Sequence, residues 1–389
     1  MIDFFHPFSI PHPSFLESFG TSMSTLAEII QEYGPAYQAK FAARLLPSHR
    51  RALQDIAHCR TVAFGGHLYQ CPDCQARHYQ YHSCQNRHCP QCQFKAGQQW
   101  LSTQQALLLP TPYFLVTFTL PQALRPIARR HQRLLYNLLF RASAAALQEL
   151  AWDPRYVGGQ IGMVGILHTW GRQLTYHPHV HYLVPAGGLA ADGQQWLPAR
   201  PNFLVPVRAL SRLFRAKFCA GLRATALFDQ VPPDTWQIDW VVHCKSVGDG
   251  THALRYLAPY IFRVAISNNR ILKVNQGKVT FRYRQADTGQ IRLSTLTAEE
   301  FLRRFLQHIL PKGFVKVRYY GLFSPARRYL LPLLHLWLDG SSAATPLDDE
   351  SKARASSSSP LLTSDVVCPN CGQVMHCLRK LRPRSRCPP

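Results

Sequence analysis

Long apolar runs are missing from this sequence of 389 residues, and no stretch approaches the roughly 18 apolar residues of a membrane-spanning helix. The first twenty residues contain prolines and histidines and lack a basic cluster, so they do not have the pattern of a secretory signal peptide. A Walker loop, Gly-x4-Gly-Lys-Ser/Thr, is also absent, so a built-in helicase is not expected. These absences predict a protein of a reducing cytoplasm that does not contact membranes.

Acidic side chains are scarce, because 21 Asp and Glu residues stand against 44 Lys and Arg residues, and the formal net charge is +23. Residues 111–339 hold most of the excess, with 29 basic and 11 acidic side chains, whereas residues 1–110 have 8 and 6. Concentrated positive charge suits a partner with a phosphate backbone. A basic, solvated surface without such a partner is the alternative that composition leaves open.

Cysteine is plentiful, with 12 residues, and in a reducing compartment we expect metal ligation or buried thiols rather than disulfides. Two Cys-x2-Cys pairs, Cys71/Cys74 and Cys89/Cys92, are separated by 14 residues. Facing pairs of this kind close a tetrahedral thiolate site around zinc. The spacing therefore predicts one zinc site made of these four cysteines, and because a closed site has no position for water, its role is structural.

Two further sets of residues are candidates for zinc binding. The first consists of ligands left over in the same region, which are Cys59, His67, Cys84 and His88. The second lies near residue 370, where Cys368-x2-Cys371 resembles one zinc knuckle, and Cys377, Cys387 or His376 could complete it. A single Cys-x2-Cys pair supplies only half of a tetrahedral site, so the remaining ligands stay open.

Three histidines alternate in the run His177-Pro178-His179-Val180-His181, which is followed by Gly187-Gly188 and is interpreted as a strand and a turn. Side chains two apart on a strand share one face about 6.6 Å apart, whereas side chains four apart lie about 13 Å apart. His179 and His181 are therefore predicted to bind one ion together. Ordinary core or surface histidines are the alternative interpretation.

A third ligand is expected from a neighbouring strand. Residues 161–169 form a strand-like run, and a hairpin would place it about 4.8 Å from the histidine strand. His168, near the end of this run, can then face the same ion, and Gln173 and His177 are the other candidates. A metal held by two or three protein ligands keeps open positions for a scissile phosphate.

Two tyrosines, Tyr256 and Tyr260, are four residues apart, so on a helix they would share one face about 6 Å apart along the axis. Pro259 lies between them and should kink the segment or mark its first turn. In isolation, this pair would be interpreted as two core tyrosines. The histidine motif upstream favours a functional role.

The order of these motifs resembles the HUH transposases of the insertion sequence ninety-one family, where HUH means His, hydrophobic residue, His. Zinc cysteines come first, then a strand ending in Thr-Leu-Pro, then His-Pro-His-Val-His with Gly-Gly, and then Tyr-x3-Tyr. By this resemblance, His179 and His181 bind a catalytic Mg²⁺ or Mn²⁺, Tyr256 and Tyr260 are the nucleophile pair, and the two Cys-x2-Cys pairs belong to a zinc-binding module with structural Zn²⁺.

The resemblance also implies the reaction and the partner. A tyrosine hydroxyl would attack phosphorus in single-stranded DNA, form a 5′-phosphotyrosine and release a 3′-hydroxyl, and the reverse attack would rejoin strands without ATP. The expected partner is single-stranded DNA at the ends and target of a mobile element moved by rolling-circle transposition, in the bacterial cytoplasm near the nucleoid. Arginines beside the tyrosines and on a strand-like run are the candidate DNA contacts: Arg255, Arg263, Arg282 and Arg284.

The expected fold class is α+β, with an antiparallel-sheet HUH nuclease domain flanked by helices and preceded by a small zinc-binding domain. The predicted divisions are a helical segment (1–58), the zinc-binding domain (59–105), the nuclease domain (110–330), a Ser/Ala/Pro-rich linker (340–366) and a zinc knuckle (367–389). Two other functions stay open: a plasmid replication initiator or relaxase with the same chemistry, and a non-catalytic zinc DNA-binding protein.

Overall fold

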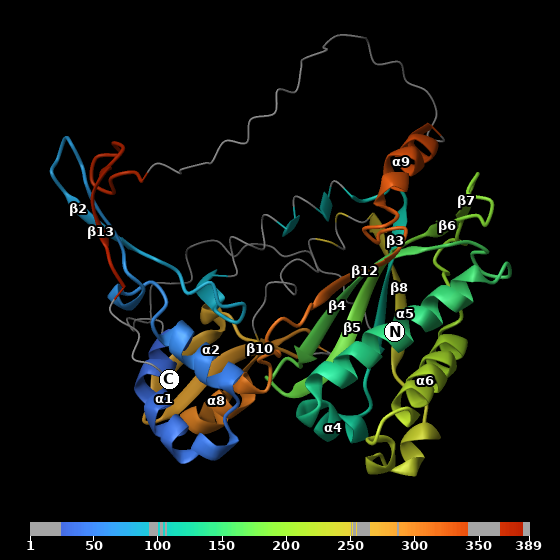
Figure 1. Cartoon of the computed structure of the whole chain (residues 1–389), viewed down its shortest axis with the longest axis horizontal. Coiled ribbons are helices and arrows are strands. Elements are labelled where there is room, and N and C mark those ends of the chain that lie inside the picture. The colour runs from blue at the N-terminus through green and yellow to red at the C-terminus, as the bar shows by residue number, and fades with distance from the viewer. Residues whose placement is uncertain are drawn as a thin grey trace, which may run out of the picture.

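A five-stranded antiparallel sheet forms the centre of the computed structural model (Figure 1). The structure describes residues 25–92, 100–101, 104–105, 107–249, 251, 254, 265–285, 288–340 and 366–383. From one edge of the sheet to the other, the strands are β12 (Val317–Gly321), β4 (Gly162–Trp170), β5 (Tyr176–Pro185), β3 (Pro112–Thr119) and β8 (Val242–Asp249). The α+β class predicted from the sequence is confirmed.

Helices cover one face of this sheet (Figure 1). They are α4 (Arg125–Arg130), α5 (Gln132–Trp152) and α6 (Val207–Arg223). Val180, Tyr182 and Val184 alternate along β5 and point into this core, where all three are fully buried. The hydroxyl of Tyr182 is bonded to Ser143 of α5 at 2.8 Å, so its burial leaves no unsatisfied polar group.

The opposite face of the sheet carries a second apolar row and, further along the same strands, the histidines. Val164 and Ile166 of β4 and Leu183 of β5 lie on this face and pack with Leu254. Helix α9 (Leu331–Gly340) contributes buried leucines to the same cluster. Because side chains alternate along a strand, residues 164, 166 and 168 share this face, as do residues 179, 181 and 183.

A separate core joins segments that are far apart in the sequence. Its elements are α1 (Leu26–Lys40), α2 (Pro47–Ala57), the three-stranded antiparallel sheet of β9 (Ile271–Asn275), β10 (Lys278–Arg284) and β11 (Ile291–Thr297), and α8 (Ala298–Leu306). Thr297 caps the N-terminus of α8, because its Oγ1 accepts a hydrogen bond from the Glu300 amide at 3.2 Å. The N-terminal helices therefore share their core with residues 265–309.

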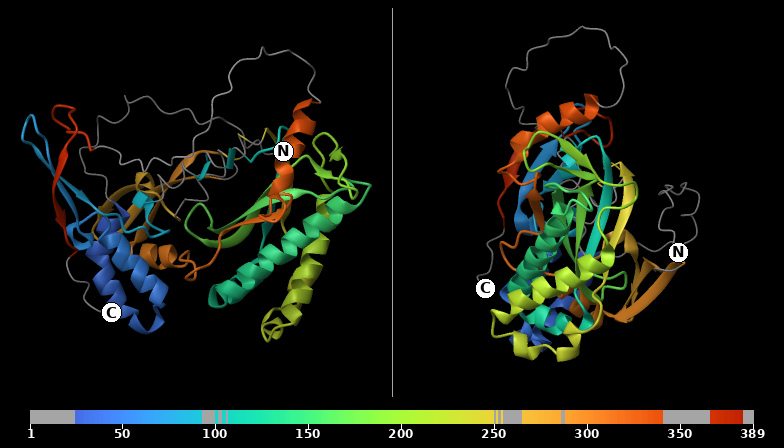
Figure 2. Two further views of the ribbon diagram at one scale, coloured as in Figure 1. Left: turned by 45° about the horizontal axis from the view of Figure 1, so that its top comes forward. Right: turned by 90° about the vertical axis from the view of Figure 1, so that its right-hand side faces the viewer.

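A third antiparallel sheet joins a strand near the C-terminus to two strands from the N-terminal part of the chain, as Figures 1 and 2 show. Its strand order is β13 (His376–Leu381), β1 (Gly66–Gln70) and β2 (Arg77–Tyr81). In the register, Gly66 faces Leu381 and Gln70 faces His376. This pairing was not expected from the sequence.

The remaining elements are short. They are strands β6 (Gly187–Leu189) and β7 (Trp196–Pro198) and the 3-10 turns Ala42–Arg44, Val62–Phe64, Gln122–Leu124, Phe228–Gln230, Pro233–Trp236, Asn268–Arg270 and Arg328–Leu330. Strand β8 begins only at Val242, because Trp240 is buried against the helical core and donates its indole N–H to the Thr235 carbonyl at 3.0 Å. No helix in the described part of the chain is both long and apolar enough to cross a membrane.

Candidate active site and zinc centres

Three histidines meet on the sheet face opposite α5 and α6. His168 of β4 lies directly across from His179 of β5 in the strand register, and His181 is two residues further along β5. The ring centroids are separated by 5.2 Å for His168 and His179, 4.7 Å for His168 and His181, and 4.8 Å for His179 and His181. One ligand nitrogen from each ring lies within 4.8 Å of the others. The structure thus brings the predicted pair and the predicted third ligand together.

Hydrogen bonds orient two of these rings. His179 Nδ1 donates to the His177 carbonyl at 2.7 Å, so in the neutral ring the lone pair is on Nε2. His181 Nδ1 lies 2.8 Å from the hydroxyl of Thr117, which is its register partner on β3. Partners of this kind fix the ring orientation of metal-binding histidines.

Burial keeps His179 and His181 neutral. Burial and, to a smaller extent, the nearby His177 and Arg125 lower the pKa of His179 to about 4, against the opposing effect of the hydrogen bond to the His177 carbonyl. The pKa of His181 is also well below its usual value, again mainly through burial. Neutral imidazoles have the free lone pairs that a divalent ion requires. Three of them leave open coordination positions, so this donor set fits a catalytic ion.

The other two candidates for third ligand lie elsewhere. Arg125 donates a hydrogen bond at 2.7 Å to His177 Nδ1, so the proton of the neutral His177 ring is on Nε2 and neither nitrogen offers a lone pair. Gln173 lies in the turn between β4 and β5, and its carbonyl accepts a hydrogen bond from Arg304 at 3.1 Å. The ring of His177 is 5.2 Å from that of His179, beside the cluster.

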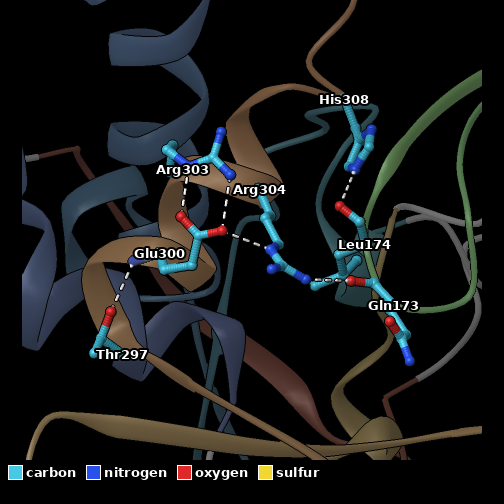
Figure 3. Close-up of polar contacts among 7 residues, drawn as sticks. All are labelled: Gln173, Leu174, Thr297, Glu300, Arg303, Arg304 and His308. Carbon is cyan, nitrogen blue, oxygen red and sulfur yellow. Dashed lines mark hydrogen bonds and ion pairs between the residues drawn. The ribbon is translucent and has the colours of Figure 1, made fainter. Parts of the chain in front are cut away.

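The turn of the β4–β5 hairpin is anchored by residues 304 and 308, as Figure 3 shows. His308 Nε2 donates to the Leu174 carbonyl at 3.2 Å, and its Nδ1 lies 3.3 Å from the Thr169 hydroxyl. His308 is 2% exposed, and burial lowers its pKa to about 4. A neutral His308 therefore links β4 to the turn of the hairpin that holds the clustered histidines.

Glu300 organises the arginines of α8 (Figure 3). Its carboxylate forms ion pairs with Arg303 at 2.5 Å and Arg304 at 2.7 Å. The hydrogen bonds from Arg303 and then from Arg304 lower the pKa of Glu300 to about 2, against the opposing effect of burial. Arg304 is thereby held in position to reach the hairpin turn.

A basic cavity of about 720 Å³ lies between this hairpin turn and the β9–β11 sheet. Arg172 spans the two parts, since its guanidinium donates to the carbonyls of Arg284 and Gln285 at 3.0 and 2.6 Å. The lining residues are Arg172, Gln173, Thr175, Tyr283, Arg284, Gln285 and Arg292. The predicted DNA contact Arg284 thus lines the cavity, whereas the predicted contact Arg282 is exposed on the same strand and is not part of the lining. Arg172 and Arg292 were missed, because each is a single arginine without basic neighbours in the sequence.

The predicted nucleophiles Tyr256 and Tyr260 and the predicted DNA contacts Arg255 and Arg263 lie outside the described residues. Their neighbour Leu254 is described and is 1% exposed.

The structure divides the predicted zinc ligands differently from the spacing-based prediction. Cys89 and Cys92 lie with Cys59 and Cys84, whereas Cys71 and Cys74 lie with a pair from the C-terminal region, Cys368 and Cys371. Within the first group, Cys92 Sγ is 3.5 Å from both Cys59 Sγ and Cys84 Sγ. The predicted four-cysteine set is therefore not one cluster, because the two pairs it joins face different partners.

The two histidines of the predicted second set do not join the cysteines. His88 is engaged elsewhere, since its Nε2 accepts a hydrogen bond from the Leu310 amide at 3.2 Å. His67 lies on β1, and its ring centroid is 5.1 Å from that of His82. Cys59 and Cys84 of that set do lie together, and the pair Cys89/Cys92 supplies the other two cysteines of their cluster.

Comparison with known proteins identifies the family. A model described as "Transposase zinc-binding domain" matches residues 29–120, and a model described as "Putative transposase" matches residues 162–329. "Putative transposase y4qJ" of Sinorhizobium fredii (strain NBRC 101917 / NGR234) is 41% identical over 350 residues, which are 84% of this chain and 87% of that protein. "Transposase for insertion sequence element IS801" of Pseudomonas savastanoi pv. phaseolicola is 30% identical over 283 residues, 68% of each chain.

The chain belongs to the insertion sequence ninety-one family of transposases. No solved structure matches it. The zinc-binding match includes both upstream Cys-x2-Cys pairs and, together with the cysteine clusters, supports structural zinc in this transposase. The second match includes all three clustered histidines, and membership of the family implies DNA as the substrate.

Proposed function

We propose that this transposase nicks and rejoins single-stranded DNA at the ends of a mobile element through a 5′-phosphotyrosine intermediate, as in rolling-circle transposition. The observation that carries this proposal is the group of three histidines on adjacent strands of one sheet face. His168, His179 and His181 would hold the ion, and a bound divalent ion would polarise the scissile phosphate and neutralise charge in the transition state.

The position of Leu254 supports Tyr256 and Tyr260 as the nucleophiles. Leu254 packs with Val164 and Leu183, which lie on the same sheet face as the histidines. His181 is two residues from Leu183 along β5, a separation of about 7 Å. The tyrosines follow Leu254 by two and six residues, so this segment has the reach to deliver a hydroxyl to the histidine cluster.

The described residues on either side of the tyrosine segment lie at opposite ends of the sheet. Asp249 pairs with Pro112, at the end of the sheet remote from the β4–β5 turn. Beyond the segment, Arg270 donates to the Arg172 carbonyl at 2.7 Å, at that turn. A ten-residue strand separates these two ends by about 30 Å.

The chemistry follows from these groups. The tyrosine oxygen would attack phosphorus, the bond from phosphorus to the 3′ oxygen would break, and that oxygen would leave as a 3′-hydroxyl after it takes a proton. One phosphoester bond replaces another, so the reverse attack by a 3′-hydroxyl restores a DNA strand without an added energy source. The second tyrosine permits a second linked strand transfer.

The basic cavity is proposed to guide the single strand toward the histidines. Three arginines supply phosphate contacts and Tyr283 offers an aromatic surface for base stacking, which is the combination found in channels for single strands. The turn of the hairpin that holds His168 and His179 lines the cavity, so bound DNA would lie close to the metal ligands. Arg282 could extend this surface along β10.

The cavity assignment is tested by measuring affinity for a single-stranded oligonucleotide over a range of salt concentrations. The variant Arg284→Gln with Arg292→Gln should bind more weakly, and its plot of log affinity against log salt should be shallower by about 1.4, because each lost phosphate contact removes about 0.7. Exposed arginines of α6, on the far side of the sheet, provide the control Arg208→Gln with Arg212→Gln. An equal loss in both variants would contradict the assignment.

The reaction is tested with single-stranded oligonucleotides that carry candidate element ends, in the presence of Mn²⁺. Wild-type protein should give a covalent protein–DNA band, and His179→Ala with His181→Ala should give none while it stays folded and binds DNA. The control variant His58→Ala with His131→Ala changes two exposed histidines outside the cluster and should cleave normally. Cleavage by the first variant at the wild-type rate would overturn the proposed metal pair.

A further inference from the structure

The second cysteine cluster joins segments that are 300 residues apart. Cys71 and Cys74 follow β1, and Cys368 and Cys371 precede β13, which is the neighbour of β1 in its sheet. The matched zinc-binding domain ends at residue 120, so it contains only the first pair. The second pair lies beyond both family matches.

The two pairs have the same local geometry. Each has the pattern Cys-Pro-x-Cys, followed by a residue with a positive φ, which is 57° at Gln75 and 79° at Gly372. In each, the amide of the first cysteine donates to the carbonyl five residues later, at 3.0 Å for Cys71 and 2.7 Å for Cys368. Two equivalent turns thus present their sulfurs to each other.

The separations between sulfurs match a tetrahedral zinc site. The Sγ atoms are 3.4 Å apart for Cys71 and Cys371, 3.5 Å for Cys74 and Cys368, and 3.6 Å for Cys74 and Cys371. Four thiolates at 2.3 Å from one zinc ion would lie about 3.8 Å apart. A disulfide requires about 2.05 Å, so these cysteines are not arranged as disulfides.

An apolar shell surrounds the inner half of this cluster. Cys71 and Cys368 are 0% and 2% exposed and pack with the buried Met375 and with Tyr69. The other two sulfurs belong to exposed residues, so an ion can enter from solvent. The site has four thiolate ligands and no position for water, which is the arrangement of structural rather than catalytic zinc.

We propose that Cys71, Cys74, Cys368 and Cys371 bind one structural Zn²⁺ that fastens the C-terminal segment to the N-terminal zinc-binding domain. This zinc clasp, defined by these four cysteines, is separate from the site of Cys59, Cys84, Cys89 and Cys92. It completes the sheet β13–β1–β2 and closes residues 71–371 into one loop. Residues 366–383 are then a part of the zinc-binding domain and not an independent knuckle.

Zinc content tests the clasp. Native mass spectrometry of the full chain should find two zinc ions in the wild type and one in Cys368→Ser with Cys371→Ser. Cys377 lies on β13 but outside the cluster, so Cys377→Ser is the matched control and should retain two ions. Two ions in the double variant would overturn the proposal, as would a single ion in the wild type.

A cleavage experiment tests the connection even if the double variant folds poorly. A site for a sequence-specific protease is inserted between residues 350 and 355, and the full-length, zinc-loaded protein is cut there. The fragment that carries residues 366–389 should remain bound through size-exclusion chromatography and should dissociate when a zinc chelator is added. Dissociation of the fragment from zinc-loaded protein would contradict the clasp. DNA cleavage is not measured in either experiment, so the outcome is independent of the proposed nuclease reaction.

Discussion

Replacement of Thr117 by valine isolates the contribution of one hydrogen bond to the proposed catalytic metal site. The Thr117 hydroxyl lies 2.8 Å from His181 Nδ1 and is half-buried on the neighbouring strand. Valine keeps the β-branched shape, so the strand should be retained. Only the hydrogen bond between the side chain of residue 117 and the His181 ring should be lost. The change removes a group that orients the ligand without touching the ion.

The expected effect is a weaker affinity for metal. Loss of a partner that orients a metal-binding histidine costs about 10–100-fold in metal affinity, or about 1.4–2.7 kcal/mol. Loss of the hydrogen bond itself should lower the free energy of unfolding by only about 1 kcal/mol. The Mn²⁺ concentration at half-maximal cleavage should therefore rise 10–100-fold, while the rate at saturating Mn²⁺ stays close to that of the wild type.

The assay combines cleavage rates over a series of Mn²⁺ concentrations with direct measurement of free Mn²⁺ by electron paramagnetic resonance. Thr280→Val is the control, because Thr280 also makes a cross-strand hydroxyl bond, to Thr295 at 2.9 Å, but in the β9–β11 sheet. If Thr117→Val leaves the Mn²⁺ midpoint unchanged, or shifts it no more than Thr280→Val does, His181 is not oriented by Thr117 for metal binding.

Three further predictions concern the ligands and the supporting shell. His168→Ala should weaken Mn²⁺ binding strongly whereas His177→Ala should not, and equal effects in the same titration would refute His168 as the third ligand. His308 has a pKa of about 4 in the folded protein against about 6.5 in the unfolded chain. The neutral ring should therefore contribute about 3 kcal/mol to the free energy of unfolding above pH 6.5, and this contribution should be lost by pH 4. In denaturant titrations, the free energy of unfolding of His308→Gln should fall less than that of the wild type between these pH values. Cys59→Ser with Cys84→Ser should remove one zinc ion and lower the melting temperature, because this cluster borders the core of α1 and α2; an unchanged melting temperature and zinc content would exclude a structural site there.

The histidine site could be predicted from the sequence because its determinants are local. Alternation along β5 puts His179 and His181 on one face, and a short hairpin fixes which strand is the neighbour, so His168 could be named before the register was known. The strand predicted at residues 161–169 is observed as β4, Gly162–Trp170.

The partition of the cysteines could not be predicted, because it depends on pairing between distant segments. Spacing identifies each Cys-x2-Cys pair but does not select the pair that faces it. Cys71 and Cys74 meet Cys368 and Cys371 because β13 adds to the edge of β1, and nothing in the sequence near residue 70 records that pairing. The shared core of α1, α2 and α8 was missed for the same reason, since it joins segments more than 200 residues apart.

Mass spectrometry of the trapped protein–DNA adduct tests the central claim most directly. Protein is incubated with Mn²⁺ and a single-stranded element end, digested with protease and nuclease, and searched for a peptide that carries a nucleotide on tyrosine. The proposed mechanism predicts a 5′-phosphate linked to Tyr256 or Tyr260, and no adduct from Tyr256→Phe with Tyr260→Phe, which keeps both rings and removes only the attacking oxygens. A nucleotide on any other residue, or an undiminished adduct in the double phenylalanine variant, would contradict it.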